Sequence, residues 1–142
     1  MKKYRKGYTT GVYDMFHIGH LNVLNNAKKY CDYLLVGVST DELVKEYKGK
    51  TPIIPFEERI KIVENIKCVD EVIVQKDMNK LSALLENNCD VIFVGDDWKG
   101  TDKWNTYEKD FNKHGIDVVY LPYTKGTSST VLREVIYNEL HK

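Results

Sequence analysis

Two histidines lie three residues apart at the expected start of a helix, with two glycines nearby. His17 and His20 would share one helix face, and Gly11 and Gly19 could let a phosphate approach the backbone. The first turn of a helix has unpaired N–H groups and a dipole that favours anions. Imidazoles there could donate hydrogen bonds to a phosphate whose charge grows in a transition state. A single histidine would fit a helix cap or a surface position better, but the pair with both glycines favours a phosphate site.

A lysine-rich stretch offers further cationic groups. Lys48 and Lys50 carry flexible ammonium groups that suit phosphate oxygens, although a solvated basic loop would have the same composition. The segment Gly49-Lys50-Thr51 looks like the end of a P-loop, but that motif needs glycine where Val44 stands. The sequence therefore excludes a P-loop and leaves a second phosphate-binding cluster and a solvated loop as alternatives.

The segment Gly95-Asp96-Asp97-Trp98 places two carboxylates side by side after an apolar run. Adjacent side chains of an extended stretch point in opposite directions, so we expect no metal site here. A carboxylate can instead accept a hydrogen bond from the exocyclic amine of cytosine, a donor that uracil lacks. A carboxylate of this segment would fit that task, with Trp98 either walling the pocket or packing in the core.

A run of hydroxyl side chains, 126–130 (GTSST), precedes the last expected helix. Glycine and hydroxyl groups that open a helix form a cradle for anions. An ordinary N-cap would explain one hydroxyl group but not four. The run therefore predicts a second phosphate-binding helix start.

Strand and helix patterns alternate along the whole chain. Residues 7–12 (GYTTGV) look like a first strand, a continuous apolar run predicts a strand at 33–38, and shorter stretches predict strands at 71–74, 91–94 and 118–121. Helical spacing predicts helices at 18–30, 56–66, 78–85, around 107–111 before Gly115, and at 129–140. This order predicts one α/β Rossmann-like domain over residues 1–142, with a parallel sheet of about five strands and helices on both faces. Ligands are expected beyond the carboxyl ends of the strands, where every cluster above falls.

The composition narrows the class of protein. Of 142 residues, 42% are hydrophobic, which is ordinary for a globular domain, and 21 basic residues balance 21 acidic ones. Zero net charge argues against a nucleic-acid partner, and no apolar run reaches the ~20 residues of a membrane helix. The basic N-terminus lacks the apolar region of a signal peptide, and the three cysteines are odd in number without C-x-x-C spacing. We therefore expect free thiols and a cytoplasmic location.

His17-Ile-Gly19-His20 resembles the H-x-G-H signature of the nucleotidyltransferase superfamily. Six blocks along the chain resemble, in order, landmarks of the glycerol-3-phosphate cytidylyltransferase family. They are 11–14 (GVYD), 38–41 (VSTD), 58–59 (ER), 69–72 (VDEV), 95–98 (GDDW) and 126–130 (GTSST). The resemblance spans nearly the whole chain. It implies transfer of CMP from CTP to a small phosphorylated alcohol, foremost glycerol 3-phosphate, giving CDP-glycerol and pyrophosphate.

The resemblance also implies roles for individual residues. The catalytic residues would be His17, His20, Lys48 and Lys50. Those that bind the nucleotide would be Gly11, Val12, Tyr13, Asp14, Gly19, Asp97, Thr127, Ser128, Ser129 and Thr130. Those that bind the acceptor would be Asp41, Lys48, Arg59 and Tyr123. Mg²⁺ would accompany CTP, held mainly by phosphates and waters with Asp14 as an outer ligand, and the chain would form a homodimer.

Arg59 has an alternative explanation, because a neighbouring carboxylate such as Glu57 or Glu58 could pair with it. The chain also departs from the family pattern twice. Tyr123 stands where the second signature usually has arginine, and Lys67 stands where an arginine commonly precedes V-D-E-V. Neither side chain has the guanidinium fork that binds phosphate at two points, which leaves the acceptor open.

Three alternatives to the glycerol phosphate reaction follow. Phosphocholine, phosphoethanolamine, another polyol phosphate or a phosphorylated amide could be the acceptor. The chain could also be an adenylyltransferase of the same superfamily, since the S-S-T-x-L-R helix start resembles those enzymes too, although Asp97 favours cytosine. From a different class, it could be a nucleotide-binding module without turnover, which the presence of both histidines and both lysines disfavours.

Overall fold

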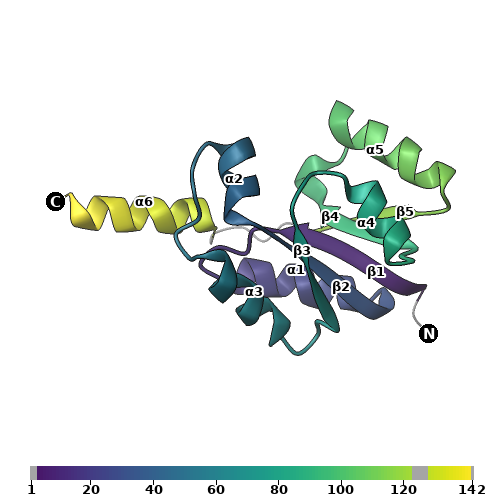
Figure 1. Cartoon of the computed structure of the whole chain (residues 1–142), viewed down its shortest axis with the longest axis horizontal. Coiled ribbons are helices and arrows are strands. Elements are labelled where there is room, and N and C mark those ends of the chain that lie inside the picture. The colour runs from purple at the N-terminus through teal and green to yellow at the C-terminus, as the bar shows by residue number, and fades with distance from the viewer. Residues whose placement is uncertain (1–2, 123–127, 142) are drawn as a thin grey trace.

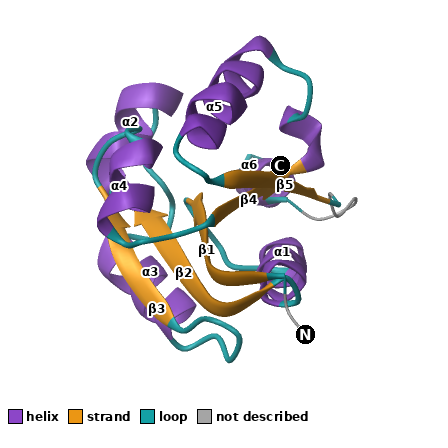
Figure 2. Ribbon diagram, turned by 90° about the vertical axis from the view of Figure 1, so that its right-hand side faces the viewer, coloured by secondary structure: helices purple, strands orange, loops and turns teal. Residues whose placement is uncertain are grey.

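Five parallel strands form the sheet at the centre of the fold. The structure, a computed structural model, describes residues 3–122 and 128–141. The strands are β1 (Tyr4–Gly11), β2 (Cys31–Ser39), β3 (Glu71–Gln75), β4 (Val91–Gly95) and β5 (Asp117–Leu121). They lie in the order β3-β2-β1-β4-β5, and all pairs are parallel (Figures 1 and 2). The expected α/β fold with five parallel strands is confirmed.

Helices cover both faces of this sheet (Figure 2). They are α1 (Ile18–Lys28), α2 (Asp41–Lys48), α3 (Phe56–Glu64), α4 (Lys80–Glu86), α5 (Asp102–Lys113) and α6 (Ser129–Leu140). On one face, α1 and α3 bury Leu24, Ala27 and Val63 against the strands. On the other, α4 and α5 bury Leu84 and the aromatic rings of Trp104 and Phe111. Two apolar cores thus fix the sheet from both sides.

Two local elements differ from the expectation. Helix α2 was not among the predicted elements. Only Leu43 and Val44 of its eight residues are buried, so the sequence shows too little helical spacing to recognise it. Thr40 begins this helix by accepting a hydrogen bond from the Leu43 N–H. The expected extended stretch after β4 is instead a 3₁₀ helix over Asp96–Trp98.

The order of the strands places a ligand site between β1 and β4. From β1 the chain runs outward to β2 and β3, and it then crosses to β4 and β5 on the other side. The loops that leave β1 and β4 therefore diverge at their carboxyl ends and open a crevice there. Helix α6 extends from the same end of the sheet, opposite the N-terminus, and buries none of its residues (Figure 1). Among the described residues, no helix is long and apolar enough to span a membrane.

Gly7 provides a test of how tightly the central strands pack. A Cβ atom at this position of β1 would lie 2.3 Å from Cε2 of Phe93 in β4. We expect Gly7→Ala to lower the free energy of unfolding by about 1–3 kcal/mol, because the ring must shift within a filled core. Urea unfolding measures the loss. The loss should shrink when Phe93→Leu is present, and an equal loss in both backgrounds would contradict the contact.

Candidate active site

A cavity of about 700 Å³ lies at the carboxyl ends of β1 and β4. It brings together residues from five separate segments of the chain, as the strand order requires. Of the residues expected to bind substrates, the following line it: Gly11, Val12, Tyr13, Asp14, His17, Gly19, His20, Lys48, Lys50, Asp97, Ser128, Ser129 and Thr130. Two expected residues, Tyr123 and Thr127, lie outside the described residues.

The histidine pair caps α1 and also lines the cavity. His17 is the N-cap of α1, and its Nδ1 accepts a hydrogen bond from the Gly19 N–H at 3.0 Å. His20 Nδ1 accepts in turn from the His17 N–H at 3.2 Å, and the two rings stack with centroids 3.9 Å apart. The capping alternative and the phosphate-site interpretation are therefore compatible, because capping uses only one nitrogen of each ring.

This cap also fixes which ring nitrogen carries the proton. A neutral imidazole whose Nδ1 accepts a hydrogen bond carries its hydrogen on Nε2. Within the described part of the chain, His17 Nε2 is buried and has no hydrogen-bond partner. Burial lowers the pKa of His17, and burial followed by repulsion from His17 lowers the pKa of His20 to about 4. Near neutral pH both rings are therefore uncharged and offer Nε2–H donors.

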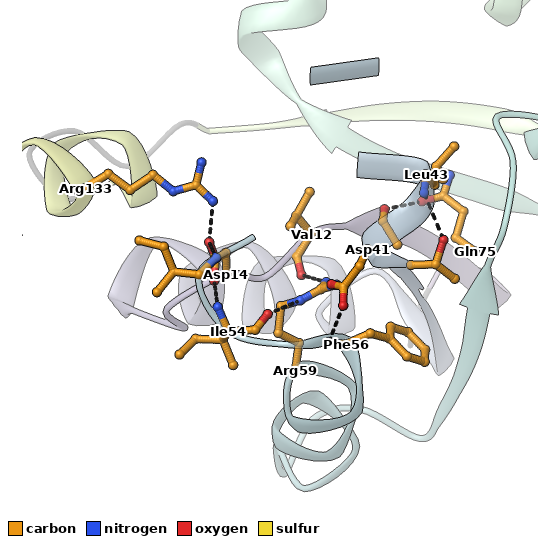
Figure 3. Close-up of polar contacts among 12 residues, drawn as sticks. Val12, Asp14, Asp41, Leu43, Ile54, Phe56, Arg59, Gln75 and Arg133 are labelled. Carbon is orange, nitrogen blue, oxygen red and sulfur yellow. Dashed lines mark hydrogen bonds and ion pairs between the residues drawn. The ribbon is translucent and has the colours of Figure 1, made fainter. Parts of the chain in front are cut away.

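The start of α6 forms the opposite wall of the cavity. Ser128 caps this helix by accepting from the Val131 N–H at 3.1 Å, and Ser129 Oγ donates to the backbone oxygen of Asp14 at 2.6 Å. Arg133, one turn after Ser129, also lines the cavity and pairs with the Asp14 carboxylate (Figure 3). Among the described residues, Arg133 Nε is buried and has no hydrogen-bond partner. The sequence analysis did not assign Arg133 a role, although its spacing from Ser129 puts both on one helix face.

Lys48 and Lys50 reach the cavity because of how α2 ends. Lys48 is the last residue of this helix, and Gly49 follows in a left-handed conformation with φ of 77°. That conformation is the usual helix stop, and it turns the chain so that Lys50 also lines the cavity. Burial lowers the pKa of Lys48, and the nearby cations Arg133 and Lys50 lower it further. These cations accumulate where an anionic ligand would balance them.

The Asp96–Trp98 turn supplies the wall next to β4. Asp97 Oδ1 lies 2.6 Å from where a Cβ on Gly95 would stand, so the exposed carboxylate folds back over the end of β4. Trp98 is 46% exposed and lines the cavity, so the core-packing alternative is wrong for this residue. The buried tryptophan is Trp104, which is 5% exposed. Within residues 3–122 and 128–141, no cluster of three histidine, cysteine, aspartate or glutamate side chains could hold a metal ion.

Asp41 and Arg59, expected at the acceptor site, do not line the cavity. Arg59 is only 1% exposed, and its Nη2 pairs with Asp41 Oδ1 at 2.7 Å (Figure 3). Arg59 therefore does pair with a carboxylate, but the prediction that Glu57 or Glu58 provides it is wrong. The guanidinium lies beneath the loop that follows α2, where its donors already bind protein oxygens.

A buried lysine that the sequence analysis did not single out lies beside the cavity. Lys80, the first residue of α4, is 8% exposed, and its Nζ donates to Thr10 Oγ1 at 3.0 Å. Burial, with repulsion from Lys103, lowers its pKa to about 8. Thr10 lines the cavity, so this cation adds to the positive charge at the end of β1. No local pattern marks a lysine for burial, so sequence reasoning had no signal here.

Comparisons with known proteins identify the family of the chain. The sequence model of the cytidylyltransferase-like family matches residues 8–135. The glycerol-3-phosphate cytidylyltransferase of Bacillus subtilis is 41% identical over 93% of this chain and 97% of its own length. The enzyme of the same name from Staphylococcus aureus is 36% identical, with 92% and 94% covered.

Solved structures give the same fold. A lipopolysaccharide core biosynthesis protein from Thermoplasma volcanium matches with a TM-score of 0.71 and 29% identity, covering 87% of this chain and 99% of its own. The pantoate-beta-alanine ligase of Francisella tularensis shares the fold alone, with a TM-score of 0.65 at 14% identity, covering all of this chain and 73% of the ligase. With its family match over residues 8–135 and these relatives over nearly its whole length, the chain belongs to the cytidylyltransferase-like family.

Proposed function

We propose that the protein transfers CMP from CTP to glycerol 3-phosphate, giving CDP-glycerol and pyrophosphate. The observation that carries this proposal is the end-to-end match to relatives named for that reaction, up to 41% identical over 97% of their length. The cavity is consistent with it, because neutral imidazole donors, lysines and a hydroxyl-rich helix start meet in one space.

The reaction needs positioning and charge stabilisation, and no enzyme nucleophile takes part. An oxygen of the acceptor phosphate attacks the α-phosphorus of CTP in line, and the bond from that phosphorus to the pyrophosphate oxygen breaks. The Nε2–H groups of His17 and His20 would donate to the α-phosphate as its charge grows. Lys48 and Lys50 would hold the donor and acceptor phosphates near each other. Ser129, Thr130 and Arg133 would hold the departing pyrophosphate.

Mg²⁺ bound with CTP would neutralise phosphate charge, coordinated mainly by phosphate oxygens and waters. The Asp14 carboxylate accepts hydrogen bonds from Ile53 N–H, Ile54 N–H and Arg133, so it does not fit a direct metal ligand. Its only suitable contact with the ion would be through water. The cytoplasmic location and the homodimer stay predictions.

The charges around the cavity favour a neutral acceptor tail over a cationic one. Among the described residues that line the cavity, the carboxylates are Asp14, which is already bound, and Asp97, which we assign to the base. The primary ammonium of an ethanolamine group would therefore meet lysines without a free carboxylate among the described lining residues to balance its charge.

A pyrophosphate-release assay with the four nucleoside triphosphates and a panel of phosphorylated alcohols tests the proposed function. We expect CTP with glycerol 3-phosphate to give the highest kcat/KM, and ³¹P NMR to identify CDP-glycerol. Higher kcat/KM with phosphocholine, phosphoethanolamine or a phosphorylated amide would contradict glycerol 3-phosphate as the acceptor. The proposal that the protein is a cytidylyltransferase would still stand. Turnover with ATP in place of CTP would contradict the nucleotide.

The two roles of His17 can be separated by a matched pair of substitutions. Asparagine is a good N-cap but lacks a donor at the Nε2 position, whereas alanine lacks both functions. We expect His17→Asn and His17→Ala each to lower kcat by ~10²-fold, as loss of a transition-state donor does. Thermal unfolding should show a loss of stability in the alanine variant only. Near-normal turnover of a folded His17→Asn would contradict the catalytic role of Nε2.

The base preference tests Asp97. Calorimetric titration should show CTP binding at least about tenfold tighter than UTP, since uracil has no exocyclic amine to donate to the carboxylate. Asp97→Ala should shrink this ratio, and Asp97→Asn, which keeps an acceptor oxygen without the charge, should shrink it less. An unchanged ratio in Asp97→Ala would place the recognition of cytosine elsewhere.

A further inference from the structure

We propose that Arg59 is a positioning residue that fixes, from beneath the cavity, the segment carrying Lys48 and Lys50, and thereby controls acceptor binding without touching the acceptor. The effect on acceptor binding rests on the proposed function, whereas the structural part can be tested without turnover. In this arrangement Arg59 does not contact the acceptor phosphate itself, and it acts only through the positions of Lys48 and Lys50.

Three elements meet at the Arg59 guanidinium (Figure 3). Its Nη1 donates to the Val12 oxygen at 2.6 Å, at the exit of β1. Its Nη2 pairs with Asp41 at the first residue of α2, and its Nε donates to the Ile54 oxygen at 2.8 Å. A planar guanidinium with donors in fixed directions suits such a bridge, and a lysine could not reproduce it.

Asp14 holds the same loop from another direction. The Asp14 carboxylate accepts from the N–H groups of Ile53 and Ile54, both at 2.9 Å. Since Arg59 binds the carbonyl oxygen of Ile54, this residue is held through both its amide hydrogen and its carbonyl oxygen. The two clamps leave the loop after Lys50 little freedom to move relative to β1.

The start of α2 is fixed by the same arginine. Asp41 Oδ1 binds Arg59, while Asp41 Oδ2 accepts from the Phe56 N–H at 3.3 Å at the start of α3. The segment from Asp41 to Ile54 is thus held at both of its ends. Lys48 and Lys50 lie between these ends and line the cavity, so their reach depends on the Arg59 bridge.

Direct contact between Arg59 and a substrate is disfavoured by its surroundings. The side chain is 1% exposed and does not line the cavity, and each of its three nitrogens already donates to a protein oxygen. A buried guanidinium that gave up these bonds for a phosphate would leave carbonyl oxygens without partners.

Arg59→Met keeps an apolar stem and removes the three donors, so it is the main test. We expect the KM for glycerol 3-phosphate to rise by about tenfold or more. The KM for CTP should change by less than about threefold, because the proposed contacts of CTP with the histidines, the start of α6 and Asp97 do not depend on the two lysines. Lys61→Met, on the exposed side of α3, removes a charge from the same helix and should leave both constants unchanged. Equal KM changes for both substrates, or no change for the acceptor, would overturn the proposal.

A double-mutant cycle with Lys50→Ala separates indirect from direct action. If Arg59 acts through the lysines, Arg59→Met should raise the acceptor KM much less when Lys50 is already alanine. If the KM increases caused by Arg59→Met and Lys50→Ala simply multiply in the double variant, Arg59 acts independently of Lys50, and the proposal would be overturned.

Hydrogen exchange distinguishes failure of this proposal from failure of the proposed function. In Arg59→Met, the amides of Ile53 and Ile54 should exchange at least about tenfold faster, while amides of β2 keep their protection. This result is expected whether or not the acceptor is glycerol 3-phosphate. Unchanged exchange would overturn the clamp. If Arg59→Met does not fold, the same measurements on Arg59→Lys, which cannot bridge three oxygens, decide the proposal in the same way.

Discussion

The candidate site depends on one buried carboxylate. Asp14 is 2% exposed and binds the Ile53 and Ile54 amides, while Arg133 pairs with it from α6. Burial by itself would raise the pKa of Asp14, but hydrogen bonds from the two amides and from Arg133 lower it overall. A buried charge is tolerated only when it is paired and hydrogen-bonded, so loss of any partner would disturb the others.

The backbone around this carboxylate is also unusual. Tyr13 and Met15, on either side of Asp14, have positive φ angles of 55° and 49°. Such conformations cost of order 1–3 kcal/mol each in residues other than glycine and persist only where the surroundings impose them. The hydrogen bonds and the ion pair of Asp14 hold the backbone in these conformations. The resulting turn connects the end of β1 to the histidine cap of α1. Asp14 therefore connects the histidine cap of α1, the start of α6 and the loop that follows the two cavity lysines.

The sequence predicted the sheet and most of the cavity, because both follow from patterns within short stretches. Apolar runs marked β2, β4 and β5, and the chemistry of the histidines, lysines and hydroxyl groups was visible at the strand ends. The partners across the fold could not be predicted in this way. Asp41 lies 18 residues from Arg59, and Arg133 lies 119 residues from Asp14, so no periodicity connects them.

Burial was a second property that the sequence did not reveal. Arg59 and Lys80 belong to residue types that are rarely buried, and nothing in their neighbourhoods marks them as exceptions. The two tryptophans also show that residue type does not decide burial, because Trp98 is exposed and Trp104, six residues later, is buried. Solvent exposure in these cases is decided by the packing of α4 and α5 and the turn after β4, which no single segment encodes.

The capping of α1 by imidazole nitrogens has a consequence for how the reaction responds to acid. Each Nδ1 that closes the helix start must keep its lone pair, and burial already opposes a second proton on either ring. Burial holds the pKa of each ring below the usual histidine value, so the pair is poorly suited to carry protons near neutral pH, although histidine is the side chain most often used for that purpose. A phosphate monoester, in contrast, has its second ionisation near pH 6. With such an acceptor, the fall in rate just below neutral pH would report the charge of the incoming nucleophile, and the protein would contribute a constant electrostatic background.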